Sequence, residues 1–304
     1  MNLAHLHIVL NHVPSLGMLL GLVLFIAALY KKSESLKKVS LQVIVIVALL
    51  ALPTYLSGNA AQWMLQNRTD IPKAFVEAHQ NAAMVTLGLM TITGTFAWFG
   101  LWQFRRYSRP GGGTTVAVLI LSIFTTAAIL QTASLGGLIN HTEIRPPAVD
   151  EVAGWREPVS LFTNSESWVW PASETLHFIG MTLLFGVTLA VNMRMLGMMK
   201  SIPFAALHRL LPLGVLGFVI NTLTGMVFYI ASPEMYFLNV GFELKMVMLI
   251  IAGISVLYFT VFDEPWAVGP DKEAPVMAKV VAVCSTGMLL GVMYFGRMLP
   301  FLRN

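Results

Sequence analysis

The sequence predicts an all-α integral membrane protein in which eight transmembrane helices form two four-helix bundles. Hydrophobic residues make up 56% of the 304 residues and charged residues only 11%, whereas about a quarter of a typical soluble domain is charged. The mean hydropathy is +0.73, and eight stretches reach the roughly 20 apolar residues that a helix needs to cross a bilayer. These observations indicate a polytopic membrane protein in contact with lipid. The net charge of +4 gives no reason to expect a nucleic-acid partner.

The first half of the chain contains four predicted helices. Its start, MNLAHLHIVLNHV, has no basic region and no small-residue cleavage site, so we expect the first apolar stretch to stay in the membrane rather than to be removed as a signal. Pro72 suits the first turn of the third helix, and the segment RRYSRPGGG before the fourth predicts a turn. The four helices are Leu6–Tyr30, Leu41–Met64, Ala74–Phe104 and Thr114–Asn140.

The second half contains four more helices. His208 and Arg209 open the sixth, and Glu243 and Lys245 lie near one end of the seventh. The eighth contains the single cysteine, Cys284, which we interpret as a small packing residue. One cysteine excludes an intrachain disulfide and a covalently attached c-type heme. The predicted helices are Ala172–Leu196, Leu207–Ile230, Val240–Phe262 and Val276–Leu299.

A polar connection from His141 to Pro171 separates the two halves. It has a net charge of −3 and contains three tryptophans. The halves show no clear sequence repeat, so we expect a fusion of two unlike bundles, residues 1–141 and residues 172–304, joined by an external loop at 142–171.

The distribution of basic residues predicts the orientation in the membrane. Twelve of the 19 lysines and arginines fall on connections opposite the N-terminal side. Because basic loops stay in the cytoplasm, we expect both termini outside. In a bacterium with two membranes, the protein would then lie in the inner (cytoplasmic) membrane with its N-terminal side facing the periplasm.

Six of the seven histidines are expected at helix ends on this outer side, and only His208 on the cytoplasmic side, where we interpret it as interfacial. An imidazole in or near hydrocarbon is costly unless it is paired or bound to a metal. Clustering at one depth therefore indicates a cofactor, for which heme b held by paired histidines is the leading hypothesis. The six outer histidines are His5, His7, His12, His79, His141 and His177.

The favoured pair is His12 and His79, because they lie at similar depth in the first and third helices, which are usually diagonal in an up-down bundle. The alternative for each is an interfacial histidine bonded to a loop carbonyl. His7 and His141 are predicted as a second, shallower pair, so that one or two hemes are expected, whereas His5 is compatible with a purely interfacial role.

Several other residues are candidates for the surroundings of the heme. Arg145 and Arg156 suit the heme propionates, as charge-assisted hydrogen-bond donors, or are ordinary surface arginines. Gly17 and Gly21 either admit the edge of a macrocycle or form a close helix contact, and Gly136 with its neighbour clears space above His141.

His177 has no histidine partner in its own half. It is predicted either to join a heme between the halves or to line a quinone site, and Glu174 either orients it or serves as a helix-start charge. Lys245 and Glu243 have alternatives as well. Lys245 contacts a heme propionate, or Glu243 accepts a proton near a quinone headgroup, or both extend toward the membrane surface or pair with loop charges.

The opening HLHIVLNHVPSLG and the ending GGLINHTEIRP of the fourth helix resemble a family of small, uncharacterised four-helix bacterial membrane proteins that are predicted to bind heme. The segments SETLHFIGMTLLFG and NVGFELKMVMLIIAG resemble a second family of bacterial integral membrane proteins. These resemblances imply that Glu174 and His177 match motif positions in the second half, and that four histidines do so in the first half, namely His7, His12, His79 and His141.

The leading functional hypothesis is a membrane-bound b-type cytochrome, an electron-transfer subunit of a larger redox complex rather than a stand-alone enzyme. It would pass electrons between quinone and an external partner such as a c-type cytochrome, which the acidic connection would attract. Two alternatives stay open. One is a permease that handles copper ions, and the other is a heme-free structural anchor subunit.

Overall fold

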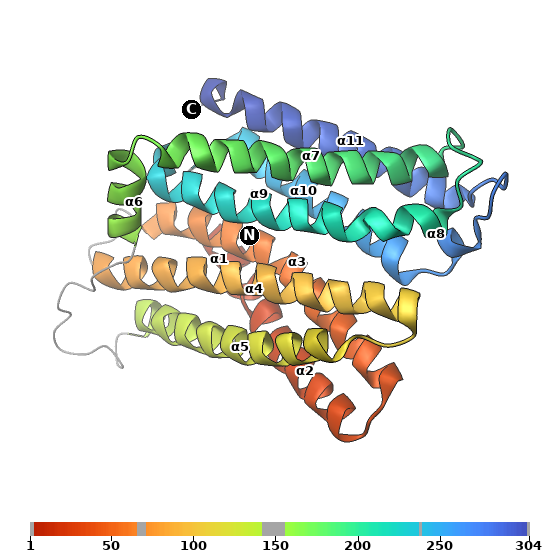
Figure 1. Ribbon diagram of the computed structural model, residues 1–304. Coiled ribbons are helices and arrows are strands. Elements are labelled where there is room, and N and C mark those ends of the chain that lie inside the picture. Colours follow the sequence, from red (N-terminus) through yellow and green to blue (C-terminus); the bar gives the residue numbers. More distant parts are fainter. Residues whose placement is uncertain (1–2, 66–70, 142–155, 237–238, 303–304) are drawn as a thin grey trace. The chain divides into compact units, whose positions relative to one another are not determined.

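The computed structural model describes residues 3–65, 71–141, 156–236 and 239–302, and these residues form helices and their connections, without a strand (Figure 1). Eight helical segments within these ranges are long and apolar enough to cross a membrane. The predicted all-α membrane protein with eight transmembrane helices is therefore confirmed. The side of the membrane on which the termini lie stays a prediction.

The chain forms two compact units. Unit 1 contains residues 1–100 and 109–166, and unit 2 contains residues 101–108 and 167–304. The last two turns of the third long helix thus belong with the second half of the chain. The division near residue 166 falls within the connection that the sequence analysis placed at 142–171.

Unit 1 is built from four long helical segments. The first is interrupted near Asn11 and consists of two helices. The elements are α1 (Leu3–Leu10), α2 (His12–Tyr30), α3 (Glu34–Leu65), α4 (Lys73–Tyr107, through Gly100), α5 (Gly112–Asn140) and α6 (Arg156–Ser165). The short helix α6 lies in the segment predicted to be a loop. It exposes Leu161 and Phe162, as a helix at a membrane surface does.

Close helix contacts hold unit 1 together. A Cβ atom added at Gly17 would lie 2.6 Å from Val47 Cγ2, and one at Gly21 would lie 2.8 Å from Ile44 Cγ1. Both glycines therefore let α2 approach α3, which supports the helix-contact reading over space for a macrocycle. Outward-facing leucines and valines of α2 are exposed, as Leu16 is at 64%, and such side chains face lipid.

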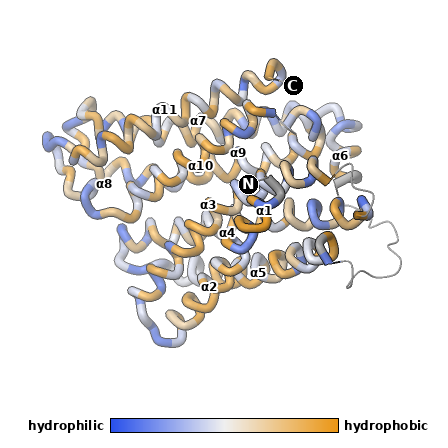
Figure 2. Tube along the Cα trace, turned by 180° about the vertical axis from the view of Figure 1, so that it is seen from behind, coloured by the Kyte–Doolittle hydropathy of each residue, from blue (hydrophilic) through white to orange (hydrophobic). Residues whose placement is uncertain are grey.

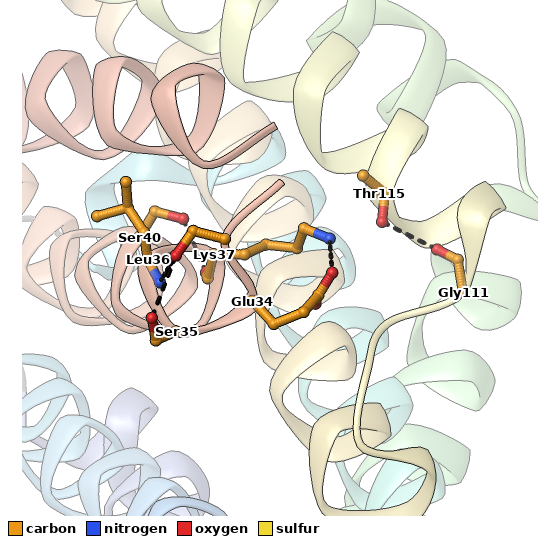
Figure 3. Close-up of polar contacts among 8 residues, drawn as sticks. Glu34, Ser35, Leu36, Lys37, Ser40, Gly111 and Thr115 are labelled. Carbon is orange, nitrogen blue, oxygen red and sulfur yellow. Dashed lines mark hydrogen bonds and ion pairs between the residues drawn. The ribbon is translucent and has the colours of Figure 1, made fainter. Parts of the chain in front are cut away.

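The turns of unit 1 that carry basic residues have their own polar contacts. The hydroxyl of Ser33 accepts from the backbone N–H of Leu36 and caps α3. Lys37 and Glu34 form an ion pair at 2.7 Å, and the hydroxyl of Thr115 donates to the carbonyl of Gly111 (Figure 3). Figure 2 shows that hydrophobic residues cover the long helices and that hydrophilic residues lie mainly at the helix ends.

Unit 2 is a second group of four long helical segments with short helical turns between them. The elements are α7 (Val169–Met195), α8 (Phe204–Leu207), η2 (His208–Leu210), α9 (Leu211–Ala231), η3 (Pro233–Met235), α10 (Val240–Val261), η4 (Glu264–Ala267), α11 (Val276–Met298) and η5 (Leu299–Phe301). Helix α7 packs against α9 and α11, and α11 packs against α10.

Charges at the connections of unit 2 are paired or bonded to the backbone. Glu273 accepts from Lys279 at 2.7 Å and from Lys200 at 3.1 Å, and these hydrogen bonds lower the pKa of Glu273 to about 2. The buried guanidinium of Arg194 donates to the carbonyls of Ile202 and Gly269. Glu273 therefore stays ionised at neutral pH between two lysines.

The α7–α9 crossing generates a stability prediction. A Cβ atom at Gly217 would lie 2.4 Å from the Gly180 carbonyl oxygen and 2.7 Å from Leu184 N. Since these are backbone atoms that cannot move aside, Gly217→Ala should destabilise the protein by about 1–3 kcal/mol. Gly225→Ala on the same helix meets nothing within 4 Å and serves as the control. Thermal unfolding in detergent measures both, and equal midpoints for the two variants would contradict the prediction.

Candidate functional site

Two of the predicted histidines lie close together in unit 1. The His7 ring from α1 and the His79 ring from α4 have centroids 6.3 Å apart, and their planes are inclined by 75°. Both side chains are half-buried. The structure therefore brings together two imidazoles from helices that are remote in the sequence.

The orientation of His7 is fixed by α3. Its Nδ1 lies 3.1 Å from the Thr54 carbonyl oxygen and 3.1 Å from Ser57 Oγ, while the Ser57 hydroxyl donates to the same carbonyl at 2.7 Å. The carbonyl oxygen can only accept, and the Ser57 hydroxyl already donates its proton to that carbonyl. Both oxygens therefore accept from the ring, and Nδ1 of His7 carries the proton. The tautomer then places the lone pair on Nε2.

His79 is held in the same way by α5. Its Nδ1 donates to the Thr132 carbonyl oxygen at 2.9 Å. The hydroxyl of Thr132 meets that of Thr86 at 2.8 Å, which ties α5 to α4 beside the ring. His79 therefore also has a protonated Nδ1 and a lone pair on Nε2, and no hydrogen bond to Nε2 of either ring occurs among the residues that the structure describes.

A glycine lies against each of the two rings. A Cβ atom at Gly58 would be 3.0 Å from Cε1 of His7, and one at Gly136 would be 3.1 Å from Cε1 of His79. Each imidazole thus rests on helix backbone, and a larger side chain would displace it. Gly136 was singled out in the sequence as clearing space, but for His141, whereas it clears space for His79.

The pairing in the structure differs from the predicted one. His79 meets His7 rather than His12, which is exposed and donates through Nδ1 to Ile8 O of the first segment at 2.7 Å. His141 is exposed at the end of α5 and forms no ring contact with His7. The prediction paired histidines that lie at similar depth. In the structure, the orientation of the His7 ring is set by its contacts with Thr54 and Ser57 on α3.

The remaining predicted residues of the first half fall outside this pair. His5 is exposed on α1. Arg145 lies outside the residues that the structure describes. Arg156 is the first residue of α6, and its side chain is not among the described ones. Sequence reasoning missed the carbonyls of Thr54 and Thr132 and the hydroxyl of Ser57. The Ser57–Gly58 pair within an apolar helix is the signal that could have indicated the contact on α3.

His177 has its own surroundings in unit 2. Its Nδ1 lies 2.8 Å from Thr224 Oγ1, and the Thr224 hydroxyl donates to Ile220 O at 2.7 Å. Nδ1 is therefore the donor, as in His7 and His79. The ring of Phe228 lies 5.4 Å from that of His177, and Glu174 is exposed, so Thr224 rather than Glu174 orients the ring.

His208 is fully buried, in contrast to its predicted interfacial place. Its ring lies 4.1 Å from that of Trp266 and stacks at 9° on Trp102. Within the described part of the chain neither ring nitrogen has a hydrogen-bond partner. The aromatic neighbours were not recognised, because Trp102 comes from α4, a helix of the first half.

Comparisons of the chain with protein-family models, with curated proteins and with solved structures gave no match.

The hydrogen bond of His177 generates a prediction for the protein in solution. Thr224→Val removes the oxygen that accepts from Nδ1, so His177 should lose its Nδ1-protonated tautomer, which ¹⁵N NMR of the histidine side chains detects. Thr222→Val is the matched control, because its hydroxyl donates to Phe218 O. An unchanged His177 signal in Thr224→Val would contradict the assignment.

Proposed function

We propose that unit 1 binds one heme b between His7 and His79 and that the protein is a membrane b-type cytochrome. The observation that carries this proposal is the close pair whose Nε2 lone pairs are both left for a ligand. Two imidazoles that bind one metal ion from opposite sides, each through a bond of about 2.0 Å, have ring centroids roughly 6 Å apart. The separation of 6.3 Å between His7 and His79 fits this value.

A heme needs few ligands from the protein. The porphyrin itself supplies four nitrogens to the iron, so the two imidazoles of His7 and His79 would be enough to hold it. This small requirement supports the cytochrome proposal.

The residues around the pair would tune the bound group. His7 and His79 would hold the heme without leaving the iron a free position, and a heme held in this way would supply electron transfer rather than oxygen chemistry. The Thr54 and Thr132 carbonyls accept from the two Nδ1–H groups. Such bonds fix ring orientation and raise the basicity of the ligating nitrogen.

Electron exchange at the membrane surface is the role that this site supports. We propose that the protein is an electron-transfer subunit of a redox complex in the bacterial inner membrane, with the heme on the periplasmic side. It would exchange electrons with a quinone from the bilayer and with an external c-type cytochrome. The acidic connection supports a basic external partner, and the basic residues opposite the N-terminal side support the orientation.

Spectroscopy of the purified full-length protein tests the cytochrome proposal. Reduced-minus-oxidised and pyridine hemochrome spectra should show protoheme. His7→Ala and His79→Ala should each remove one whole heme equivalent, because either change takes away an axial ligand. His12→Ala and His208→Ala should remove none.

Two results would contradict this assignment. Folded wild-type protein without protoheme would overturn the cytochrome proposal and favour the heme-free anchor subunit. Loss of heme in His12→Ala but not in His7→Ala would restore the pairing predicted from depth.

The glycine beside His79 generates a separate prediction. Gly136→Val places a branched side chain where even a Cβ atom would lie 3.1 Å from the ring, so it should displace His79 and lower heme content to less than half. Gly186→Val on α7 meets nothing within 4 Å and should leave heme content unchanged. The ratio of heme absorbance to protein concentration measures both, and equal ratios would refute the steric argument.

A further inference from the structure

The outer end of unit 2 carries a lysine within a membrane-spanning helix. Lys245 lies in the second turn of α10, and its side chain runs along α11 at Gly296, where a Cβ atom would lie 3.4 Å from Nζ. Among the described residues, Lys245 forms no ion pair or hydrogen bond. A cation in this position is costly and usually marks a binding or transport function.

Lys245 and His177 belong to the same end of unit 2. Helix α11 packs against both α7, which carries His177 near its start, and α10, which carries Lys245 near its start. Since Nδ1 of His177 donates to Thr224, Nε2 offers a lone pair. One hydrogen-bond donor and one acceptor are therefore carried by two helices that share α11 as a neighbour.

Aromatic rings gather at this end of unit 2. Phe228 lies 5.4 Å from His177 and 5.0 Å from Trp170, and Tyr229 stacks on Phe242 at 6.3 Å. These rings come from the start of α7, the end of α9 and the start of α10 (Figure 1). Aromatic walls with a few placed polar groups are typical of sites for small molecules.

We propose that this end of unit 2 binds the headgroup of a lipid-soluble quinone. Lys245 donates a hydrogen bond to a ring oxygen, and Nε2 of His177 accepts one from the ring hydroxyl of the reduced form. The choice of a quinone rests on the proposed electron-transfer function. A phosphate would satisfy Lys245 but would turn its own lone pairs toward that of His177, whereas a quinol ring supplies both a donor and an acceptor.

Access from the bilayer suits such a ligand. The neighbours of His177 on α7, Leu176 and Phe178, are exposed at 49% and 55%, and they face lipid in a membrane-spanning helix. A lipid-soluble molecule therefore reaches this face of α7 without crossing water.

The test measures quinone binding to the full chain in nanodiscs of neutral phosphatidylcholine. The probe is decylubiquinol, kept reduced under argon, because only the reduced ring carries the hydroxyl that donates to His177. Its binding is followed by tryptophan fluorescence, and titration against empty nanodiscs gives the apparent Kd. Lys245→Met and His177→Phe should each raise the Kd about tenfold or more, because each removes a hydrogen bond to the ring. Lys245→Arg should restore most of the affinity. Arg297→Met, at the exposed neighbour of Gly296, is the control and should bind as the wild type does.

A steric variant keeps both polar groups. Gly296→Val should also weaken binding, because it displaces the side chain of Lys245. Helical circular dichroism and thermal midpoints verify that every variant is folded.

The possible results separate this inference from the cytochrome proposal. Wild-type protein that binds no quinone, or variants that all bind it equally, would overturn the quinone site. Binding of phosphatidylglycerol that depends on Lys245, without quinone binding, would overturn it in favour of an anionic-lipid site. Quinone binding in protein without heme would refute only the cytochrome proposal, since the titration does not depend on heme.

Discussion

Hydrocarbon offers no hydrogen bonds, so a polar group that these helices carry into the membrane is costly unless another part of the chain satisfies it. Threonine hydroxyls show how this is done. The hydroxyl of Thr93 donates to Leu89 O on its own helix and meets Thr125 of α5 at 2.7 Å. Three histidines follow the same pattern, since His7, His79 and His177 each use Nδ1 for a bond to a neighbouring helix, whereas His208 packs between aromatic rings. The protonation and direction of each ring are consequences of this constraint.

The position of Thr54 shows how the constraint joins the fold to the site. Pro14 has no N–H, so the Leu10 carbonyl lacks its usual helical donor. The hydroxyl of Thr54 lies 3.4 Å from that carbonyl but donates to Leu50 O of its own helix at the shorter distance of 2.9 Å, while the carbonyl of Thr54 accepts from His7. Thr54 therefore ties the first membrane segment to α3 mainly through His7, and this bond sets the orientation of the His7 ring beside His79.

Hydropathy and length predicted the eight membrane helices, because crossing a bilayer imposes the same demand on every segment. Helix ends extended further than predicted, as in α3, which begins at Glu34 rather than Leu41, because charged residues continue a helix where water reaches it. The clustering of histidines at helix ends of the first half was also visible in the sequence. The partner of His79 was not, because depth along an ideal helix says nothing of which rings face each other. That depends on contacts between helices, such as His7 with Ser57, which sequence spacing does not encode.

His7 and His177 are oriented in the same way but lie in different surroundings. In both, the hydrogen bond from Nδ1 leaves a lone pair on Nε2. At His7 the next group is another imidazole, and two neutral nitrogens attract a metal ion. His177 instead shares its end of unit 2 with Lys245, whose charge raises the energy of any other cation nearby by an amount that grows in apolar surroundings. A heme on His177 is therefore disfavoured, and the lysine instead suits an oxygen atom that carries partial negative charge.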